Sequence, residues 1–566
     1  MTDSISQRVD AQGIESLRPT LRGTRHMAVA GHPGAAHAAF AILEAGGNAI
    51  DAGVAGGIAL GVLQSDLVNV AGVAPIMIYV AKTREVVTIS GLGTWPRAIT
   101  PDYFAKHCGG RIPHGVLRTV VPAAIDAWIT ALERYGTMSF GDCASAAIRF
   151  ARDGFPMYAL MSDMIAMHVD DYRCWPSSAE VYLPRGRVPQ PGEVFVQRDL
   201  GATLQYLADE ERAASNRGRA AGLQAVRDAF YRGDVAHAIV AYHREHGGLL
   251  ALDDLAGFRV ALEPPVCSRF GALDVYACGA WCQAPVLLEL LNIVDGIDLA
   301  ALGHNSAAYL HLLIEADKLA GADRITYTMS GVDPNTLLSD SYVDQQRQRI
   351  ARERASLGQS DHYAAELAEA VRAGNPAAAS RDHTTHFGVA DASGMAVNVT
   401  QSIGSPFGSA FMAGETGIML NNFVNWTDLD RTSPNAMEPA KKMENCMSPA
   451  QIYRDGRFYA TIGTPGSWGI LQTTPQMILN LLVFGMNVQE AIEAPRFRFL
   501  GGRKIAIEAR VPEDVRARLE ALGHEIQLLP ELSWAVGGGQ GTLRDPESGV
   551  LMGGADPRRD GYVAAC

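Results

Sequence analysis

The chain has 566 residues, of which 48% are hydrophobic and 19% are charged. This composition supplies ample apolar material for a buried core and excludes a disordered or collagen-like chain. The net charge is -13, from 48 basic and 61 acidic residues. The basic footprint of a nucleic-acid-binding protein is therefore missing, and an anionic membrane surface is an unfavourable partner. At roughly 150 residues per domain, the length corresponds to about three to four domain-sized units or to one large α/β body.

The first residues, 1–23, lack the basic start and apolar core of a secretory signal, so we expect a cytoplasmic protein. The longest uncharged apolar stretches, such as residues 52–65, fall short of the ~18 residues that suggest a membrane span. Neither the 8 cysteines nor the 15 histidines show zinc spacing, and no HExxH motif is present. We therefore expect no membrane partner, no metal and no cofactor.

Residues 28–72 are dense in small and apolar residues, and Gly46-Gly47-Asn48 interrupts the pattern. We predict a helix that ends here and a second, nearly all-apolar helix that Asp51 caps; such a helix has to be covered on every side. Residues 76–89 predict a β-hairpin around Lys82-Thr83-Arg84. A mostly helical middle follows, with periodic segments at residues 123–136, 203–216 and 306–324.

The character of the sequence changes after residue 350. Residues 354–383 are mostly charged or small and include Gly374-Asn375-Pro376, which predicts an exposed, mobile loop. Beyond the loop, a pattern of strand, Asp/Gly turn and strand predicts three hairpins. They cover residues 384–402, 451–463 and 541–554. The amphipathic helical stretch 472–494 lies between the last two, and the combination indicates a layered α/β body.

Thr384 directly follows this loop and begins the first hairpin. If the chain were cut before it, its hydroxyl would act as nucleophile. Its own α-amino group, with a reference pKa of about 7.7–8.0, would act as general base. One residue would then supply both halves of a catalytic pair. The β-propensity of threonine alone also explains a threonine at a strand start, so the argument depends on the surrounding motifs.

Seven motifs occur in order along the chain: GNAIDA, TTHFGVAD, GIMLNN, MSPAQIYRDG, IGTPGS, APRF and GADPRRDGY. Over residues 28–562 they resemble the γ-glutamyltranspeptidase family of N-terminal-nucleophile hydrolases. The resemblance implies a four-layer αββα sandwich, made as a precursor that cleaves itself between His383 and Thr384. The large segment 1–383 and the small segment 384–566 would form one folded unit.

The resemblance also implies the catalytic roles. The family forms its oxyanion hole from two backbone N–H groups after a proline, which here are those of Gly466 and Ser467; a backbone donor survives the change of the second family glycine to serine. Read alone, this segment is an ordinary Pro-Gly turn. Eighteen residues past the nucleophile the family has a hydroxyl that orients the threonine, and Ser402 stands there. The neighbouring Thr385 leaves a one-residue slip of the cut open, although the family pattern favours Thr384.

The sequence departs from the family at the positions that would hold a γ-glutamyl donor. Leu92 stands at the position of the family's arginine, and Gly404 at that of an asparagine. The segment 423–426 replaces acid or amide residues, and Asn445-Cys446 replaces two serines. An α-carboxylate calls for a bidentate arginine, and an α-amino group for an acidic partner. These changes therefore argue that the glutamyl pocket is absent.

Aromatic residues take its place: Trp95, Phe423 and Trp426, with Trp468 as a further candidate. Large rings shrink a pocket and stack on a planar acyl group. Arg97 is either a relocated clamp for a substrate carboxylate or a surface arginine. Asn445 completes the set of candidate substrate-binding residues.

Three functions follow from these observations. The first is a self-processing amidohydrolase that acts on a small non-glutamyl substrate, such as an oxamate-like monoamide, through a threonyl acyl-enzyme. The second is a γ-glutamyltranspeptidase or glutathione hydrolase whose specificity residues have moved. The third is a binding relative that never cleaves. We expect a small-molecule amide as partner and the two segments as partners of each other, and leave open whether two cleaved pairs associate as a homodimer.

Overall fold

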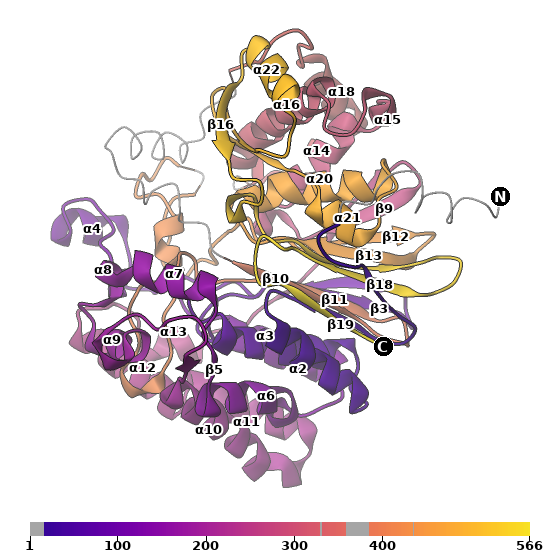
Figure 1. The fold of residues 1–566 in the computed structure, drawn as a ribbon. Helices are drawn as coiled ribbons and strands as arrows, with labels where there is room; N and C mark the ends of the chain where they lie inside the picture. Colours follow the sequence, from indigo (N-terminus) through magenta and orange to yellow (C-terminus); the bar gives the residue numbers. More distant parts are fainter. Residues whose placement is uncertain (1–15, 329–330, 358–383, 434) are drawn as a thin grey trace.

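The structure is a computed structural model that describes residues 16–328, 331–357, 384–433 and 435–566. Two seven-stranded sheets, antiparallel throughout, stack at its centre (Figure 1). The first sheet has the order β1 (Leu21–Gly23), β18 (Leu551–Ala555), β17 (Gln540–Arg544), β13 (Arg457–Gly463), β12 (Ala450–Arg454), β9 (Leu273–Ala277) and β8 (Val266–Phe270). The second has the order β19 (Tyr562–Ala565), β2 (Met27–Ala30), β10 (Thr385–Ala390), β11 (Ala396–Gln401), β3 (Ile76–Val80), β4 (Glu85–Ile89) and β7 (Leu262–Glu263).

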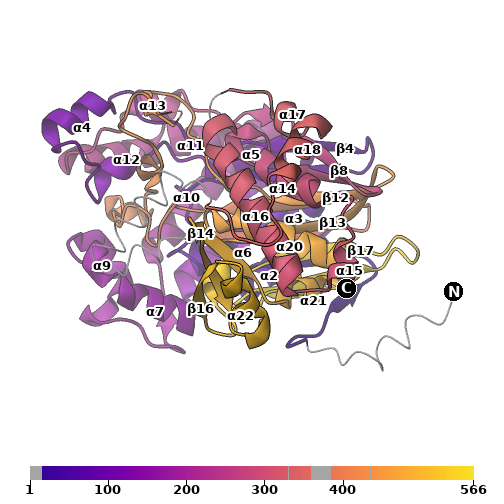
Figure 2. The same cartoon turned by 90° about the horizontal axis from the view of Figure 1, so that it is seen from above.

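Helices cover the outer face of each sheet and complete four layers (Figures 1 and 2). Helices α2 (Pro33–Glu44) and α3 (Ala49–Leu63) pack on the second sheet. Helices α14 (Pro285–Val294), α20 (Gly469–Leu482) and α21 (Val488–Glu493) pack on the first. The predicted αββα sandwich is therefore confirmed.

The all-apolar helix α3 is covered as its composition requires, since every one of its residues is buried between the second sheet and α6 (Phe140–Asp153). Its N-cap is Asn48, whose side chain accepts hydrogen bonds from Ile50 N and Asp51 N. The prediction that Asp51 is the cap was therefore wrong by three residues. Asp51 closes the capping box from inside the helix and also accepts from the backbone N–H of Thr137 at 2.8 Å.

The other predicted elements are found where the sequence places them. The first hairpin is β3–β4, and the three later ones are β10–β11, β12–β13 and β17–β18. The stretch 472–494 forms α20 and α21, and the periodic middle segments form α5 (Ala124–Tyr135), α10 (Arg198–Ala214) and α16 (Ala307–Asp323). The predicted loop 354–383 lies outside the described residues from position 358 onward, and His383 lies outside them as well.

The segments before and after residue 384 interleave. In the second sheet β10 and β11 lie between β2 and β3, and in the first sheet β12, β13, β17 and β18 lie between β9 and β1. Each sheet thus contains strands from both segments, and neither segment has a sheet of its own. Two pieces cut at this point would remain joined by backbone hydrogen bonds in both sheets.

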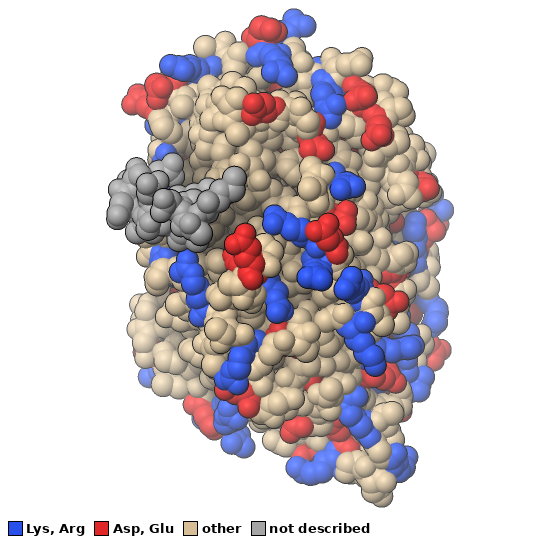
Figure 3. All heavy atoms as spheres, turned by 90° about the vertical axis from the view of Figure 1, so that its right-hand side faces the viewer, with Lys and Arg blue, Asp and Glu red and all other residues tan. Residues whose placement is uncertain are grey.

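Smaller elements surround the sandwich. Besides short 3-10 turns they are α4 (Pro101–His107), β5 (Phe155–Pro156), α7 (Ala159–Met167), α8 (Val169–Tyr172), α9 (Pro176–Tyr182), β6 (Val194–Phe195), α11 (Arg219–Tyr231), α12 (Asp234–Glu245), α13 (Leu252–Ala256), α15 (Leu299–Leu302), a π-helix (Arg324–Thr328), α17 (Pro334–Leu337), α18 (Asp340–Gln348), β14 (Phe497–Gly501), β15 (Lys504–Glu508), α22 (Glu513–Ala521) and β16 (Glu525–Leu529). Within the described ranges, every helix is too short or too polar to cross a bilayer. Figure 3 shows basic and acidic side chains mixed over one face.

Candidate active site

The strand register places Thr384 opposite Ser402. In the β10–β11 hairpin, Thr385 pairs with Gln401, so the next pair outward joins residues 384 and 402. Opposite residues on neighbouring antiparallel strands have Cβ atoms about 4.5–5.5 Å apart. Both side chains are buried, at 3% and 1% exposure. The structure therefore brings the predicted nucleophile and the predicted orienting hydroxyl together.

The stacking of the two sheets brings the same threonine to the end of β13. A Cβ built on Gly463 would lie 2.3 Å from Cε1 of His386, and one built on Gly388 would lie 3.0 Å from Oγ1 of Thr461. Strands β10 and β13 thus run in opposite directions across the interface. Thr384, two residues before His386, therefore falls beside the segment that follows Gly463. This segment is the predicted oxyanion loop.

Gly466 and Ser467 form a turn between β13 and helix α20, and both have positive φ, +137° and +51°. Among the described residues, neither backbone N–H has an intramolecular acceptor. Helix α20 begins two residues later, so the positive end of its dipole faces this turn. Two unoccupied N–H groups at a helix N-terminus are suited to stabilising a developing oxyanion.

A glycine-rich run supports this turn. The N–H of Gly538 donates to Oγ1 of Thr464 at 2.9 Å, and a Cβ on Gly537 would lie only 2.2 Å from the same oxygen. Four of the five residues in the run 537–541 are glycines. Because glycine has no side chain, the backbone of the run can approach the oxyanion loop closely. In the sequence, its position next to the last predicted hairpin was the feature that could have indicated a role at the site.

A buried network of ion pairs contacts the backbone of the glycine-rich run and holds it in position. The Asp556 carboxylate accepts a hydrogen bond from Gly539 N at 2.8 Å and forms ion pairs with Arg496 and Arg558. All three ionic side chains are fully buried. Burial alone would raise the pKa of Asp556, but Arg558 and Arg496 outweigh it and lower the pKa to about 2. The APRF and GADPRRDGY motifs therefore meet in a single network beneath the site.

Arg559 is a further site residue that the sequence reasoning did not assign, although it lies in the GADPRRDGY motif. Its Nη1 donates to the carbonyl oxygen of Thr384 at 3.3 Å, and its Nη2 donates to the carbonyl of Trp534. The guanidinium thus ties the start of β10 to the segment that precedes the glycine-rich run. It holds the backbone of the nucleophile in place.

Ser402 is held by its own turn. Its hydroxyl accepts from Gly404 N at 2.9 Å, and its backbone exchanges hydrogen bonds with Val73. Gly404 has φ +104°, and a Cβ there would lie 1.8 Å from Oδ1 of Asn422. The position at which the family has an asparagine therefore accepts only glycine in this chain. No side chain from residue 404 reaches a substrate.

The predicted aromatic residues divide into two pairs. Trp426 and Trp468 are half-buried, and their ring centroids lie 5.2 Å apart. Trp468 directly follows the oxyanion turn, and the guanidinium carbon of Arg324 lies 3.5 Å from its ring centroid. Trp95 and Phe423 are buried in the core cluster, at 2% and 1% exposure. The structure thus places a tilted indole pair next to the oxyanion turn, with Phe423 behind Trp426 and Trp95 in the core.

The arginine predicted as a relocated clamp lies at the surface. The Arg97 side chain is 59% exposed and pairs with Asp254, which is on helix α13, at 3.7 Å. This exposure and this pairing agree with the surface arginine that the sequence left as the alternative. Leu92, at the family's arginine position, is buried at 1% exposure. The predicted Asn445 is also buried, and its backbone N–H donates to the carbonyl of Trp281 at 3.2 Å.

One group of possible metal ligands occurs among the described residues: His311, Glu315 and His524. Their contacts do not fit a metal. The two imidazoles bond directly at 2.8 Å, and the carboxylate is paired with Lys318 at 2.6 Å. His311 Nε2 also donates to the carbonyl of Ala351. The cluster is a hydrogen-bonded network that anchors the chain near residue 351, and a dication would face a buried ammonium group there.

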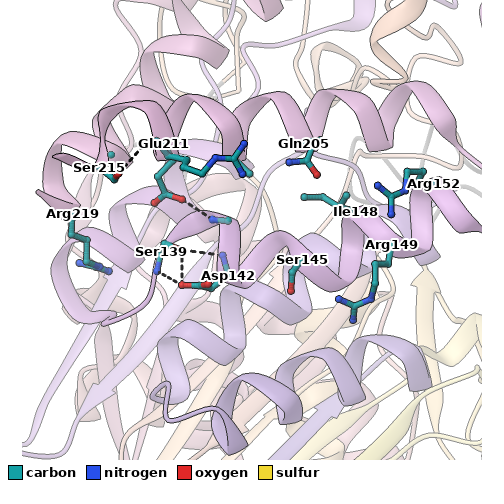
Figure 4. Close-up of a pocket in the computed structure, with 14 residues that line it drawn as sticks. Ser139, Asp142, Ser145, Ile148, Arg149, Arg152, Gln205, Glu211, Ser215 and Arg219 are labelled. Atoms are coloured by element: carbon teal, nitrogen blue, oxygen red, sulfur yellow. Dashed lines mark hydrogen bonds between the residues drawn. The ribbon is translucent and has the colours of Figure 1, made fainter. Parts of the chain in front are cut away.

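A groove of about 700 Å³ opens between α6 and α10 (Figure 4). Arg149, Arg152 and Arg219 line it, and Glu211 caps the first turn of α6 by accepting from Phe140 N at 2.8 Å. Helix α6 packs on α3, which covers the second sheet. The groove therefore opens on the outside of the helical layer and is not part of the threonine site.

Two stacked antiparallel sheets between helical layers, with a threonine at the start of a central strand, define an N-terminal-nucleophile hydrolase. The model of the family described as gamma-glutamyltranspeptidase matches residues 35–566. The chain belongs to this family, whose members here are hydrolases and acylases.

Three comparisons illustrate the likeness. The chain is 30% identical to a glutathione hydrolase-like YwrD proenzyme from Bacillus subtilis, over 96% of this chain and 99% of the relative. It is 32% identical to the acylase ACY 1 proenzyme of a Pseudomonas species (strain V22), over 96% and 94%. The crystal structure of a cephalosporin acylase from Bacillus halodurans superimposes with a TM-score of 0.86 at 29% identity, over 100% of this chain and 99% of that one.

Proposed function

We propose that the chain is the precursor of a threonine amide hydrolase, which cleaves itself before Thr384 and then acts on a small non-glutamyl acyl amide. The observation that carries the proposal is the register, which sets Thr384 opposite Ser402 and beside the turn at Gly466 and Ser467. The description of both curated relatives as proenzymes supports the cleavage step.

The proposed reaction uses groups already in place. After cleavage, the Thr384 α-amine removes the proton from its own hydroxyl, and the oxygen attacks the substrate carbonyl. The N–H groups of Gly466 and Ser467 hold the oxyanion. The amine leaves with the proton, and a threonyl ester remains. Water, deprotonated by the same α-amine, then hydrolyses the ester and releases the acid.

The proposed preference for a non-glutamyl acyl group is based on the residues at the positions that bind the glutamyl group in the family. Leu92 offers no charge to an α-carboxylate, and Gly404 offers no side chain to an α-amino group. The half-buried Trp426 and Trp468 add aromatic surface next to the oxyanion turn, and the guanidinium of Arg324 lies against the ring of Trp468. An oxamate-like monoamide is one substrate of the proposed class, and the acylase relatives support the wider class of acyl amides.

A γ-glutamyl hydrolase is the second candidate. It is supported by the Bacillus subtilis relative, which is described as glutathione hydrolase-like and covers nearly the same length. This candidate requires new partners for the α-carboxylate and the α-amino group. It predicts turnover of γ-glutamyl anilides and acceleration by amino-acid acceptors.

Intact-mass spectrometry of the wild type beside a Thr384→Ala variant tests the proposal. We expect pieces of 383 and 183 residues in the wild type, the smaller starting at Thr384, and one 566-residue chain in the variant. The cleaved protein is then assayed with acetyl, glutaryl and γ-glutamyl p-nitroanilides. Preference for the first two supports the proposal, and γ-glutamyl turnover alone supports the second candidate. A chain that stays intact after prolonged incubation would refute both and leave a binding relative.

A further inference from the structure

Five of the buried side-chain polar atoms that lack a hydrogen-bond partner among the described residues belong to Trp281, Gln283 and Asn445, outside the catalytic set. The side chains of Gln283 and Asn445 are 0% and 1% exposed. Among the described residues, none of the four polar atoms of these two amides has a hydrogen-bond partner. The indole N–H of Trp281, 7% exposed, also lacks one there. Because folded proteins leave few buried polar groups unsatisfied, this group indicates a polar partner that the protein chain does not supply.

These residues lie at the sheet edge that carries the site. Ala277, Ala450 and Ile462 pair side by side in β9, β12 and β13. Gln283 follows the first of these strands, Asn445 precedes the second, and the oxyanion turn follows the third. All three segments therefore leave the first sheet at the same edge, and neighbouring strands are separated by only about 4.8 Å.

The backbone at Gln283 is a second, independent observation. Its φ of 53° and ψ of 18° are left-handed, a conformation that favours glycine and asparagine. Its N–H donates to the carbonyl of Ala280 at 2.7 Å and closes the turn. A long polar side chain at a strained and fully buried position is the kind of outlier that occurs at binding sites.

We propose that Gln283 is a specificity-determining residue, which together with Asn445 and the Trp281 N–H binds a neutral hydrogen-bonding group, such as a carboxamide, on the acyl part of the substrate. Two side-chain amides offer donors and acceptors in equal measure and so match a neutral polar group better than a carboxylate. The cation beside Trp281, Lys442, is paired with Glu263. This inference rests on the proposed hydrolase function and names its substrate class.

The test uses the self-cleaved enzyme and three five-carbon acyl p-nitroanilides, which end in a carboxamide, a carboxylate or a methyl group. We expect the wild type to favour the carboxamide probe over the methyl probe by about five- to tenfold in kcat/KM. The Gln283→Met variant keeps the side-chain length and should lose this preference through KM. Its turnover of the methyl probe should change by less than about twofold.

Gln346→Met is the matched control. Gln346 is equally buried, at 2% exposure, but donates to Asp323 and Tyr342. Its loss should lower Tm and keep the carboxamide preference, whereas Gln283→Met should leave Tm unchanged or raise it. A fall in Tm for Gln283→Met, with equal losses on all three probes, would make Gln283 structural and overturn the inference. A wild type without carboxamide preference would overturn it as well.

Titration calorimetry with 5-amino-5-oxopentanoate, the product of the carboxamide probe, separates this inference from the function on which it rests. Binding at least about fivefold weaker in Gln283→Met, without turnover of any anilide, would refute the hydrolase function and keep the binding role. Turnover without carboxamide preference would support the hydrolase function and refute the binding role of Gln283. Equal binding, or none, in both proteins would also overturn the inference.

Discussion

Removing the charge of Asp556 should destabilise the protein far more than removing an exposed charge. Asp556→Asn keeps the shape of the side chain but leaves Arg496 and Arg558 with less compensation inside the protein. Breaking a buried ion pair from one side costs about 3–5 kcal/mol. With an unfolding entropy of about 2.1 cal/mol/K per residue, a chain of this length should lose about 3–4 °C in Tm if it unfolds as one unit.

The measurement is differential scanning calorimetry in a Thr384→Ala background, where we expect a single chain and no dissociation of pieces. The control is Asp514→Asn, because Asp514 and its partner Arg518 are 68% and 73% exposed. That pair should contribute at most about 1 kcal/mol. If Asp556→Asn and Asp514→Asn unfold within 1 °C of each other, the network does not support the site as argued.

The stability difference between the parent and Asp556→Asn should depend on pH. The folded pKa of Asp556 is about 2, below its ordinary 3.8, so its ionised form stabilises the folded state by about 2 kcal/mol above pH 4. This contribution is lost as the pH falls from about 4 towards 2. The Tm difference between the parent and Asp556→Asn should therefore shrink over this window. A difference that stays constant down to pH 2 would contradict the lowered pKa.

Three further predictions concern activity, each measured on the most active anilide. Ser402→Ala should lower kcat at least about tenfold with little change in KM, since the hydroxyl orients the nucleophile. Ser402→Thr keeps a hydroxyl and should retain most of the wild-type kcat. Equal activity of Ser402→Ala and wild type would contradict the orienting role. Arg97→Ala should leave kcat/KM within about twofold, because the Arg97 side chain is 59% exposed and pairs with Asp254; a large rise in KM would instead support Arg97 as a clamp for a substrate carboxylate. The rate should rise with pH up to about 8 as the Thr384 α-amine loses its proton, and a flat profile between pH 6 and 8 would exclude that amine as the base.

Local patterns in the sequence were sufficient for most of the helices and strands. Alternating residues around Asp/Gly turns specify the β10–β11, β12–β13 and β17–β18 hairpins, because strand and turn preferences act over a few neighbouring residues. The loop predicted before Thr384 and the strand predicted after it made this threonine a candidate nucleophile, and the order of the surrounding motifs was needed to favour that role over an ordinary strand start. The motif order then indicated the family and the αββα layers.

Only the tertiary structure decided which side chains meet. The arginine on the carbonyl of Thr384 is 175 residues away in sequence, and the guanidinium on Trp468 comes from the end of α16. Arg97 is close in sequence to the altered family position, yet its segment faces α13 and solvent. Gln283 carries no sequence motif, and its role follows from a left-handed turn and from buried amide atoms without partners. Periodicity and turn chemistry are local, whereas these contacts depend on how two sheets of interleaved strands stack, which no short stretch of sequence encodes.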